Sequence, residues 1–221
     1  SRNVNVLGPM NYKHDISLIK NVCGWRPKIK IEKGLEETWK ELNKSRKGKS
    51  SFHLEKKKIF VTGSSGFLGN NLVSTLKKRG YKVYALNKKK LDLMSMNNIK
   101  KVFTIYKPDM VFHCAGRVGG IRFTDTNPAK IFHQNMIINA NVFEACKEFG
   151  VEKLILIGAS CIYSSKKSGN FSETDIFCGP LHPSVEAYGF CKLSQIVGIK
   201  AYKSQYDLNY FSVIFPNIYG P

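Results

Sequence analysis

Acidic residues, arginine and long apolar runs are all scarce in this sequence. Asp and Glu number 16 against 35 Lys and Arg, which gives a formal net charge of +19. Most nucleic-acid readers depend on the bidentate and stacked contacts of arginine, yet arginine supplies only six of those 35 basic residues. We therefore expect solvated surface lysines and no nucleic-acid partner. No apolar run approaches the ~18 residues of a membrane span, so we expect no membrane partner either.

Paired cysteines and histidine clusters are missing as well. The six cysteines show no paired or metal-ligand spacing, and the five histidines form no constellation. No signal-peptide pattern precedes the cysteines. We expect free thiols, a cytoplasmic location and no metal site. The cysteines are Cys23, Cys114, Cys146, Cys161, Cys178 and Cys191.

A polar, basic stretch divides the chain into two unlike parts. Residues 43–51 have nothing to bury and predict a linker, which we place at residues 44–56. The preceding residues 1–43 carry two helix-like patterns around a Gly-Trp-Arg-Pro turn, which is too little for an independent core. The following residues 57–221 are enough for one full domain.

Short apolar runs alternate with longer helical patterns after the linker, as in repeated βαβ units. The sequence predicts an α/β fold, a Rossmann-type doubly wound parallel sheet. The expected strands are Lys58–Thr62, Lys82–Leu86, Met110–Cys114, Lys153–Ile157 and Tyr210–Phe215. The expected helices are Gly66–Arg79, Met96–Tyr106, Pro128–Phe149 and Val185–Tyr206.

A glycine-rich turn follows the first expected strand directly. Gly63, Gly66 and Gly69 have the spacing G-x-x-G-x-x-G, and a helical pattern begins at once. Such glycines serve the tight turn, the close approach of backbone to a pyrophosphate and the packing of helix on sheet. The helix N-terminus then offers free N–H groups to the phosphates. The pattern predicts a dinucleotide site, with ordinary turn glycines as the alternative.

The end of the second expected strand indicates which dinucleotide binds. An NAD site has an acidic residue about 20 positions after the loop, which holds the ribose 2′-hydroxyl. Here Asn87 stands in that region, followed by Lys88, Lys89 and Lys90. Because lysine attracts a 2′-phosphate and a carboxylate repels it, we predict NADP(H). A solvated lysine turn without a cofactor role is the alternative.

Tyr188 and Lys192 are four residues apart on an expected helix, which places both side chains on one face. A tyrosine with a pKa near ~10 is a poor acid–base catalyst until a cation stabilises its phenolate. Lys192 can supply that charge, so the pair is a candidate catalytic unit. The alternative is a surface helix that carries Tyr-x-x-x-Lys by chance.

Together, the loop from Gly63 to Gly69, the Tyr188/Lys192 pair and the strand end 215–221 resemble the extended short-chain dehydrogenase/reductases, which are mostly nucleotide-sugar enzymes. The pieces 118–121 (Val-Gly-Gly-Ile), 134–136 (Gln-Asn-Met) and 160–163 (Ser-Cys-Ile-Tyr) are similar to the GDP-L-fucose synthase branch of that family. The resemblance runs from about residue 58 to residue 221.

The resemblance implies an NADP(H)-dependent epimerase/reductase, homodimeric, that acts on a GDP-linked sugar. It implies that Tyr188 protonates the C4 oxygen, that Lys192 lowers the tyrosine pKa, and that Cys161 belongs to the acid–base pair that moves protons at C3 and C5. Ser160 is the remaining catalytic candidate. The implied cofactor contacts are Gly63, Ser64, Ser65, Gly66, Phe67, Leu68, Gly69, Asn87, Asp92, Leu93, Ala115, Gly116, Ile157, Gly158, Ala159, Ser160, Lys192, Phe215, Pro216, Asn217 and Ile218.

Several alternatives stay open beside that resemblance. Ala159 stands where the family has a catalytic serine, which favours Ser160 as its substitute or a cofactor-binding module without turnover. Cys161 can equally be a small buried thiol at a strand end. His113 reads as a packed core histidine, and Asp92 as either an adenine-side contact or a helix N-cap. Another family enzyme that keeps NAD bound is a further alternative.

The two ends of the sequence also carry expectations. Residues 15–39 resemble the C-terminal tail of another nucleotide-sugar epimerase, so a C-terminal segment of one enzyme precedes the N-terminal domain of a second. We expect a fragment that spans the junction of two fused or tandem enzymes, with a circular permutant as the rival. In either case we expect the sugar-binding C-terminal domain, and the family's second epimerisation residue, a histidine, to be largely or wholly missing.

Overall fold

The computed structural model of the protein describes residue 33, residues 57–216 and residue 218. Residues 57–216 belong to one compact unit. The expected tail-like segment 1–43, apart from Lys33, and the expected linker 44–56 lie outside the described residues, so both stay predictions.

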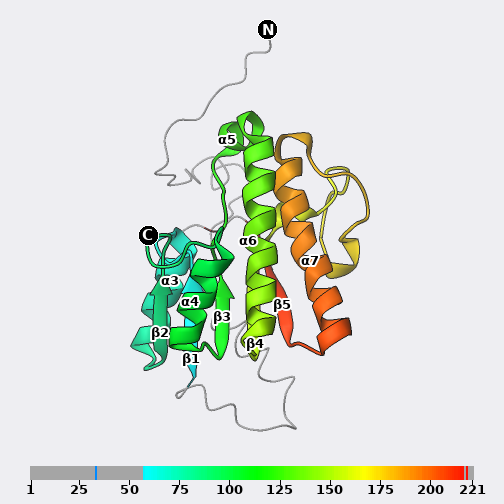
Figure 1. The fold of residues 1–221 in the computed structure, drawn as a ribbon. Helices are drawn as coiled ribbons and strands as arrows, with labels where there is room; N and C mark the ends of the chain where they lie inside the picture. Colours follow the sequence, from blue (N-terminus) through cyan, green and yellow to red (C-terminus); the bar gives the residue numbers. More distant parts are fainter. Residues whose placement is uncertain (1–32, 34–56, 217, 219–221) are drawn as a thin grey trace. The chain divides into compact units, whose positions relative to one another are not determined.

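A five-stranded parallel sheet forms the centre of this unit (Figure 1). Its strands lie in the order β2-β1-β3-β4-β5, and every neighbouring pair is parallel. Both inner strands of the first half are apolar runs with almost no exposed residue, as expected for strands covered on two faces. The strands are β1 (Lys58–Thr62), β2 (Lys82–Leu86), β3 (Met110–His113), β4 (Lys153–Ala159) and β5 (Tyr210–Phe215).

Helices cover both faces of the sheet, so the predicted doubly wound Rossmann-type architecture is confirmed. Right-handed crossovers place the helix between β1 and β2 on one face and the helices of the later crossovers on the other. On that second face α4, α6 and α7 lie side by side (Figure 1). The helices are α3 (Phe67–Lys78), α4 (Met96–Tyr106), α5 (Ile121–Thr126), α6 (Pro128–Glu148) and α7 (Glu186–Tyr206). Within the described residues, none of these helices has the length and apolarity to cross a bilayer.

The main core lies between the sheet and the second helical face. Phe60 sits at its centre, fully buried, with Phe103 of α4 packed edge-on at a ring distance of 5.3 Å. Phe143 of α6 stacks on Tyr202 of α7 at 5.1 Å, which joins the two longest helices. The core thereby fixes α6 and α7 against the sheet, and α7 carries the predicted catalytic pair.

The observed elements differ from the predicted ones mainly at the strand ends. β3 ends one residue early, at His113, whereas β4 continues to Ala159 because β5 offers it partners as far as the pair Ala159–Phe215. The short helix α5 and three 3-10 turns were not predicted. These turns are η2 (Ser160–Ile162), η3 (Glu173–Asp175) and η4 (Pro183–Val185).

From β1 the chain passes to β2 on one side of it, and from β2 it returns to β3 on the other side of β1. The direction of the connections therefore reverses between β1 and β3. In open α/β sheets, ligands bind outside the carboxyl ends of the strands at such a point. Gly63 follows β1 there and Ala115 follows β3. The fold thus brings the predicted cofactor loop and the ends of β3 and β4 to one edge.

Candidate active site

The Gly63–Gly69 loop is shaped by two glycines that have no room for a side chain. Gly63 adopts a φ of +65°, and a Cβ there would lie 2.7 Å from the Cα of Ala115. A Cβ on Gly69 would lie only 2.3 Å from the carbonyl oxygen of Gly63. These contacts close the loop on itself and on the segment after β3, so only glycine fits both positions.

Gly66 is a less crowded position of the same loop than Gly63 or Gly69. It is exposed, its φ is −79°, and a Cβ would approach only the Gly63 carbonyl oxygen, at 3.3 Å. Gly66 is also the N-cap of α3, and no side chain caps that helix. The first N–H groups of α3 therefore face the carboxyl edge without an intrahelical partner. A twelve-residue helix that begins in this way offers N–H donors and a positive dipole end to phosphate oxygens.

The other predicted loop contacts follow the same turn. Ser64 is half-buried and its N–H donates to the Leu86 carbonyl at 3.4 Å, while Ser65 and Phe67 are exposed. Leu68 is half-buried on the first turn of α3. Ala115 and Gly116 lie opposite, in the segment after β3, so the structure brings both groups of predicted contacts together.

Asn87 lies at the carboxyl end of β2 and organises the turn behind it. Its side-chain oxygen accepts from the backbone N–H groups of Lys89 at 3.1 Å and Lys90 at 3.2 Å. All three lysines that follow Asn87 are exposed. The turn therefore holds a cluster of positive charge at the same edge as the glycine loop.

Asp92 and Leu93 lie in the connection to α4, and the alternative of a helix N-cap at Asp92 is wrong. The N-cap of α4 is Ser95, whose hydroxyl oxygen accepts from the Asn98 N–H. The Asp92 carboxylate instead accepts from the Met94 N–H at 3.1 Å, in a local turn. Leu93 is buried, and its carbonyl accepts from the Asn141 side chain of α6 at 2.9 Å.

Cys161, Tyr188 and Lys192 come together at the ends of β4 and α7. Gly189, beside Tyr188, lets α7 approach η2 so closely that a Cβ on it would lie 2.8 Å from the Cys161 carbonyl oxygen. The Lys192 ammonium lies 5.6 Å from the centre of the Tyr188 ring. It also donates to the Ile157 carbonyl at 2.6 Å, which ties α7 to β4.

Burial favours the neutral form of each of these groups. It raises the pKa of Tyr188 above its ordinary value, and the nearby thiols of Cys161 and Cys191 raise it further. Burial also raises the pKa of Cys161, although the Lys192 charge partly offsets this effect. The pKa of Lys192 falls to about 8, because burial outweighs the thiols around it. The predicted lowering of the tyrosine pKa is therefore not visible in the resting site.

The end of β4 places the remaining predicted contacts. Gly158 is buried, and a Cβ on it would lie 2.9 Å from the Ser212 hydroxyl of β5, so the strands pack closely there. Ala159 is the last residue of β4 and half-buried, and Ser160 follows it as an exposed residue at the start of η2. Ser160 thus reaches the same edge as Cys161.

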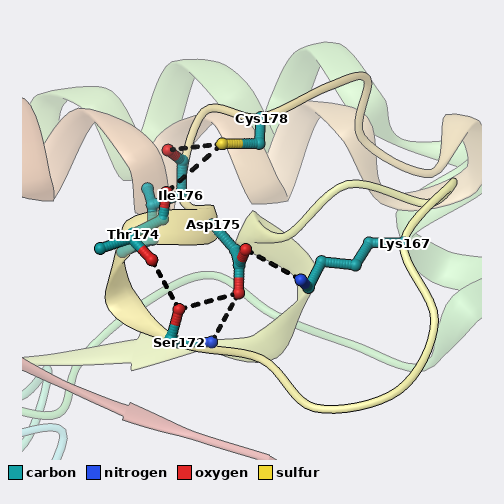
Figure 2. A network of polar contacts seen from close by, with 6 residues as sticks. All are labelled: Lys167, Ser172, Thr174, Asp175, Ile176 and Cys178. Carbon is teal, nitrogen blue, oxygen red and sulfur yellow. Dashed lines mark hydrogen bonds and ion pairs between the residues drawn. The ribbon is translucent and has the colours of Figure 1, made fainter.

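A long loop joins η2 to α7 and is held by local polar contacts. Lys167 is paired with Asp175 at 2.9 Å, and Ser172 donates through both its N–H and its hydroxyl to the same carboxylate (Figure 2). These hydrogen bonds, chiefly that from Lys167, hold the pKa of Asp175 below its ordinary value. The loop thus has a defined shape between Cys161 and Tyr188.

The segment after β3 is fixed by a residue to which the sequence pattern assigned no role. The buried Asn135 side chain of α6 accepts from the Arg117 N–H and donates to the Arg117 carbonyl, both at 2.8 Å. The Asn135 carboxamide therefore satisfies both backbone groups of Arg117, as a neighbouring strand would, and holds this loop in place. A polar residue on the buried face of an expected helix was the available signal.

His113 is a core residue, as predicted. It is fully buried, and its Nδ1 is hydrogen-bonded to the Thr62 hydroxyl at 2.9 Å. Burial, with the Lys192 charge nearby, lowers its pKa to about 3. The five cysteines among the described residues carry free thiols. No cluster that could hold a metal ion occurs within that part of the chain.

The predicted contacts at the end of β5 are placed only in part. Phe215 is the last residue of β5, and the exposed Pro216 follows it at the same edge. Asn217 lies outside the described residues, and Ile218 lies beyond the compact unit.

Comparison with known proteins shows the family of the chain. Residues 59–221 match the model of the NAD dependent epimerase/dehydratase family. The chain belongs to this family. Among curated relatives in the family, the GDP-L-fucose synthase of Sinorhizobium fredii is 37% identical over 168 residues, which are 76% of this chain and 54% of that protein. The chain spans about half the length of the curated relatives it matches.

Solved structures show the same fold with cofactor present. A GDP-D-glycero-L-gluco-heptose synthase of Campylobacter jejuni, solved in the presence of NADPH, superposes with a TM-score of 0.72 at 27% identity. The match covers 75% of this chain and 49% of that one. A GDP-L-fucose synthetase of Naegleria fowleri bound to NADP gives a TM-score of 0.65 at 29% identity, over 76% and 56% of the two chains.

Proposed function

We propose that the chain supplies the cofactor-binding and catalytic part of an NADP(H)-dependent epimerase/reductase, which converts GDP-4-keto-6-deoxy-D-mannose to GDP-L-fucose. The observation that carries this proposal is the meeting of Cys161, Tyr188 and Lys192 at the edge where the Gly63–Gly69 loop lies. A glycine loop alone fits any dinucleotide protein. An acid–base tyrosine, a lysine and a thiol beside it fit a reaction that both reduces a ketone and moves protons next to it.

The fit of a dinucleotide rests on Gly66 and on the turn at Asn87. Gly66 is exposed and carries no side chain before the uncapped N-terminus of α3, so the first N–H groups of that helix can be reached by a pyrophosphate. The exposed lysines after Asn87 suit a 2′-phosphate. Asn87 stands where an NAD site has a carboxylate, which would repel that phosphate. We assign NADP(H) as the cofactor on this ground, in keeping with the relatives solved with NADP or NADPH.

In the reduction step, NADPH would supply hydride when bound, and Tyr188 is the donor of the proton. The raised pKa keeps Tyr188 protonated at neutral pH, so it enters the step as a donor. As the C4 oxygen gains charge and takes that proton, the developing phenolate is stabilised by the Lys192 ammonium beside the ring. The Lys192 ammonium therefore stabilises the Tyr188 phenolate that proton transfer leaves, more than it affects the protonated tyrosine beforehand.

In the epimerisation step, Cys161 is one partner of the acid–base pair. Protons next to a carbonyl are acidic because the ketone oxygen holds the resulting charge as an enolate. The Lys192 charge lowers the cost of forming the Cys161 thiolate, whereas burial raises it. Ser160, exposed beside Ala159, takes the place of the family serine as a hydrogen-bond donor to the ketone.

The same proposal includes a cytoplasmic homodimer. Support for an assembly comes from an exposed apolar area on α6 and α7. Phe132 of α6 and Phe190 of α7 are each about half exposed, with ring centres 6.1 Å apart, and Val197 lies two turns further along α7. Exposed apolar residues that adjoin one another are typical of an interaction surface.

Net cofactor oxidation tests the function. The full-length protein that contains this sequence is incubated with NADPH and a GDP-linked 4-keto-6-deoxy sugar, and the loss of NADPH absorbance is followed. We expect steady oxidation with the keto sugar and none without it. An enzyme that keeps NAD bound and recycles it would show conversion without net oxidation. A cofactor-binding module would bind NADPH and convert nothing, and either outcome would refute the proposal.

A further inference from the structure

A buried polar pair lies behind Lys192, between α6 and α7. Asn139 of α6 and Gln195 of α7 are 6% and 1% exposed. Polar groups this deeply buried are costly unless they are hydrogen-bonded. Neither residue belongs to the contacts assigned above.

Both ends of the Asn139 carboxamide are engaged. Its Nδ2 donates to the carbonyl of Cys191 at 3.0 Å, and its Oδ1 accepts from Gln195 Nε2 at 2.8 Å. With one end donating and the other accepting, the carboxamide cannot turn over without losing both bonds. Asn139 is therefore held in one orientation, and it holds one particular peptide of α7.

That peptide is the one that leads into Lys192. The Cys191 carbonyl belongs to the peptide bond with Lys192, and the Lys192 ammonium reaches from this point to the Ile157 carbonyl of β4. The backbone of the lysine is thus fixed to α6, and its charged end to the sheet. Side chains that act on a ligand need such supporting contacts to stay within a fraction of an ångström of the productive position.

We propose that Asn139, oriented by Gln195, is a positioning residue for Lys192. It does not touch the cofactor or the reacting atoms. It keeps the turn of α7 that carries Lys192 at a fixed height against the sheet, and so keeps the ammonium in its buried position. This inference rests on the proposed role of Lys192 in a cofactor site.

The charge of Lys192 provides the measurement. The titratable groups that face it are His113 of β3, Cys114 after that strand, Cys161 of η2, and Cys191 and Tyr188 of α7 itself. Burial holds the pKa of Lys192 near 8. If the turn loosens and water enters, the pKa moves back toward the ordinary lysine value.

The experiment compares Asn139→Ala with Asn141→Ala in the 221-residue chain. Asn141 is a matched control because it lies on the same helix and also donates to a backbone carbonyl, that of Leu93, at 2.9 Å. NADPH affinity is measured by fluorescence titration from pH 7 to 10. In the wild type we expect affinity to fall above about pH 8, where Lys192 loses its proton.

Asn139→Ala should weaken binding about tenfold at pH 7 and shift the fall in affinity upward by about one pH unit. Asn141→Ala should keep the wild-type midpoint, whatever it costs in melting temperature. Gln195→Met is the second variant, because it removes the Nε2 donor that orients Asn139, whereas the Oε1 lost with it has no partner among the described residues. It should shift the midpoint in the same direction by less.

The outcomes separate this inference from the proposed function. If the wild-type chain binds NADPH and both Asn139→Ala and Gln195→Met keep the wild-type midpoint, Asn139 is an ordinary core residue and only the inference fails. If the wild-type chain does not bind NADPH at any pH, the proposed function fails and takes this inference with it.

Discussion

The β1 side and the α7 side of the carboxyl edge are prepared for ligands in opposite ways. On the β1 side, the exposed and uncapped N-terminus of α3 at Gly66 is already present, and no ionisable side chain has to change state. On the α7 side, Cys161, Tyr188 and Lys192 are all shifted toward their neutral forms by burial.

This difference indicates how the two sides respond to change. Backbone donors depend on chain geometry, so their function fails when a glycine is replaced. Burial opposes the charged form of each group on the α7 side, so Lys192, which is charged at neutral pH, destabilises the resting protein, while Cys161 and Tyr188 stay neutral. The first side should be sensitive in folding and binding, and the second in rate and in pH dependence.

The largest expected effect is on the β1 side. Gly69→Ala places a Cβ 2.3 Å from the Gly63 carbonyl oxygen, and two backbone segments must separate to admit it. We expect a loss of at least about 3 kcal/mol in the free energy of unfolding, measured by urea denaturation. Gly66→Val is the control, because its Cβ would lie 3.3 Å from the same oxygen, a much milder contact.

Gly66→Val should cost no more than about 1 kcal/mol of stability and yet abolish NADPH binding, since the side chain fills the space in front of the α3 N–H groups. Thermal melts with and without NADPH give both answers. A Gly66→Val protein that still gains melting temperature from NADPH would show that the phosphates bind elsewhere.

On the α7 side, two substitutions in the full-length protein should impair different steps, one the reduction and the other the proton exchange. Tyr188→Phe removes the proton donor for the C4 oxygen, so reduction should fall by the ~10²–10⁴-fold typical of a lost general acid. Exchange of the C3 and C5 protons with heavy water does not need that step and should survive. Cys161→Ser leaves a group far harder to ionise than a thiol, so exchange should fall first.

Mass spectrometry of the sugar nucleotide incubated in heavy water, beside NADPH absorbance, reads both rates. The separation breaks down if Cys161→Ser exchanges deuterium at the wild-type rate. In that case Cys161 is a packing residue, and the epimerase part of the proposed function is wrong.

Replacing Lys192 should reveal the stability cost of the α7 side. Lys192→Met removes a buried charge but leaves the Ile157 carbonyl without that donor, for a net gain of roughly 1 to 3 kcal/mol at pH 7. The folded pKa, about 8, lies below the ordinary value of 10.5. Unfolding therefore takes up a proton between those two pH values, and raising the pH through this window stabilises the wild type.

The measurement is the difference in free energy of unfolding between Lys192→Met and wild type, taken at pH 7, 8, 9 and 10. We expect the advantage of Lys192→Met to shrink steadily above pH 8. A difference that stays constant across this range would mean that the Lys192 charge is not destabilising in the folded protein.

The smallest expected effect is a change of cofactor preference at Asn87. Asn87→Asp places a carboxylate beside the lysine turn, which should repel a 2′-phosphate and favour the ribose hydroxyl of NAD. We expect the ratio of NADP to NAD affinity to fall by about tenfold, as measured by fluorescence titration of both cofactors. A clear NAD preference in the wild type would overturn the cofactor assignment itself.

Much of the fold was predictable because its signals are local. The runs Lys58–Thr62, Lys82–Leu86 and Tyr210–Phe215 are apolar strands bounded by turns, and the structure has them with those bounds. The end of β4 was missed because its last residues are strand only through pairing with β5. α5 was missed because six residues are too few for a helical period to show.

The candidate site likewise has features that local sequence predicts and features that depend on packing between distant elements. The glycine loop was predictable as a phosphate cradle because its chemistry is made by consecutive residues. That a Cβ would be far more crowded at Gly69 than at Gly66 depends on the distance of each from Gly63, which sequence spacing does not contain. The close approach of Cys161 to Tyr188 and the shifted pKa of Lys192 likewise depend on how α7 packs against η2 and β4.

The Asx turn at Asn87 has an evolutionary consequence. The structural task of this side chain is to accept two backbone N–H groups, and an aspartate oxygen performs that task equally well. Asparagine and aspartate codons differ by a single base, so on the proposed assignment one mutation lowers the preference for NADP while the turn keeps its hydrogen bonds.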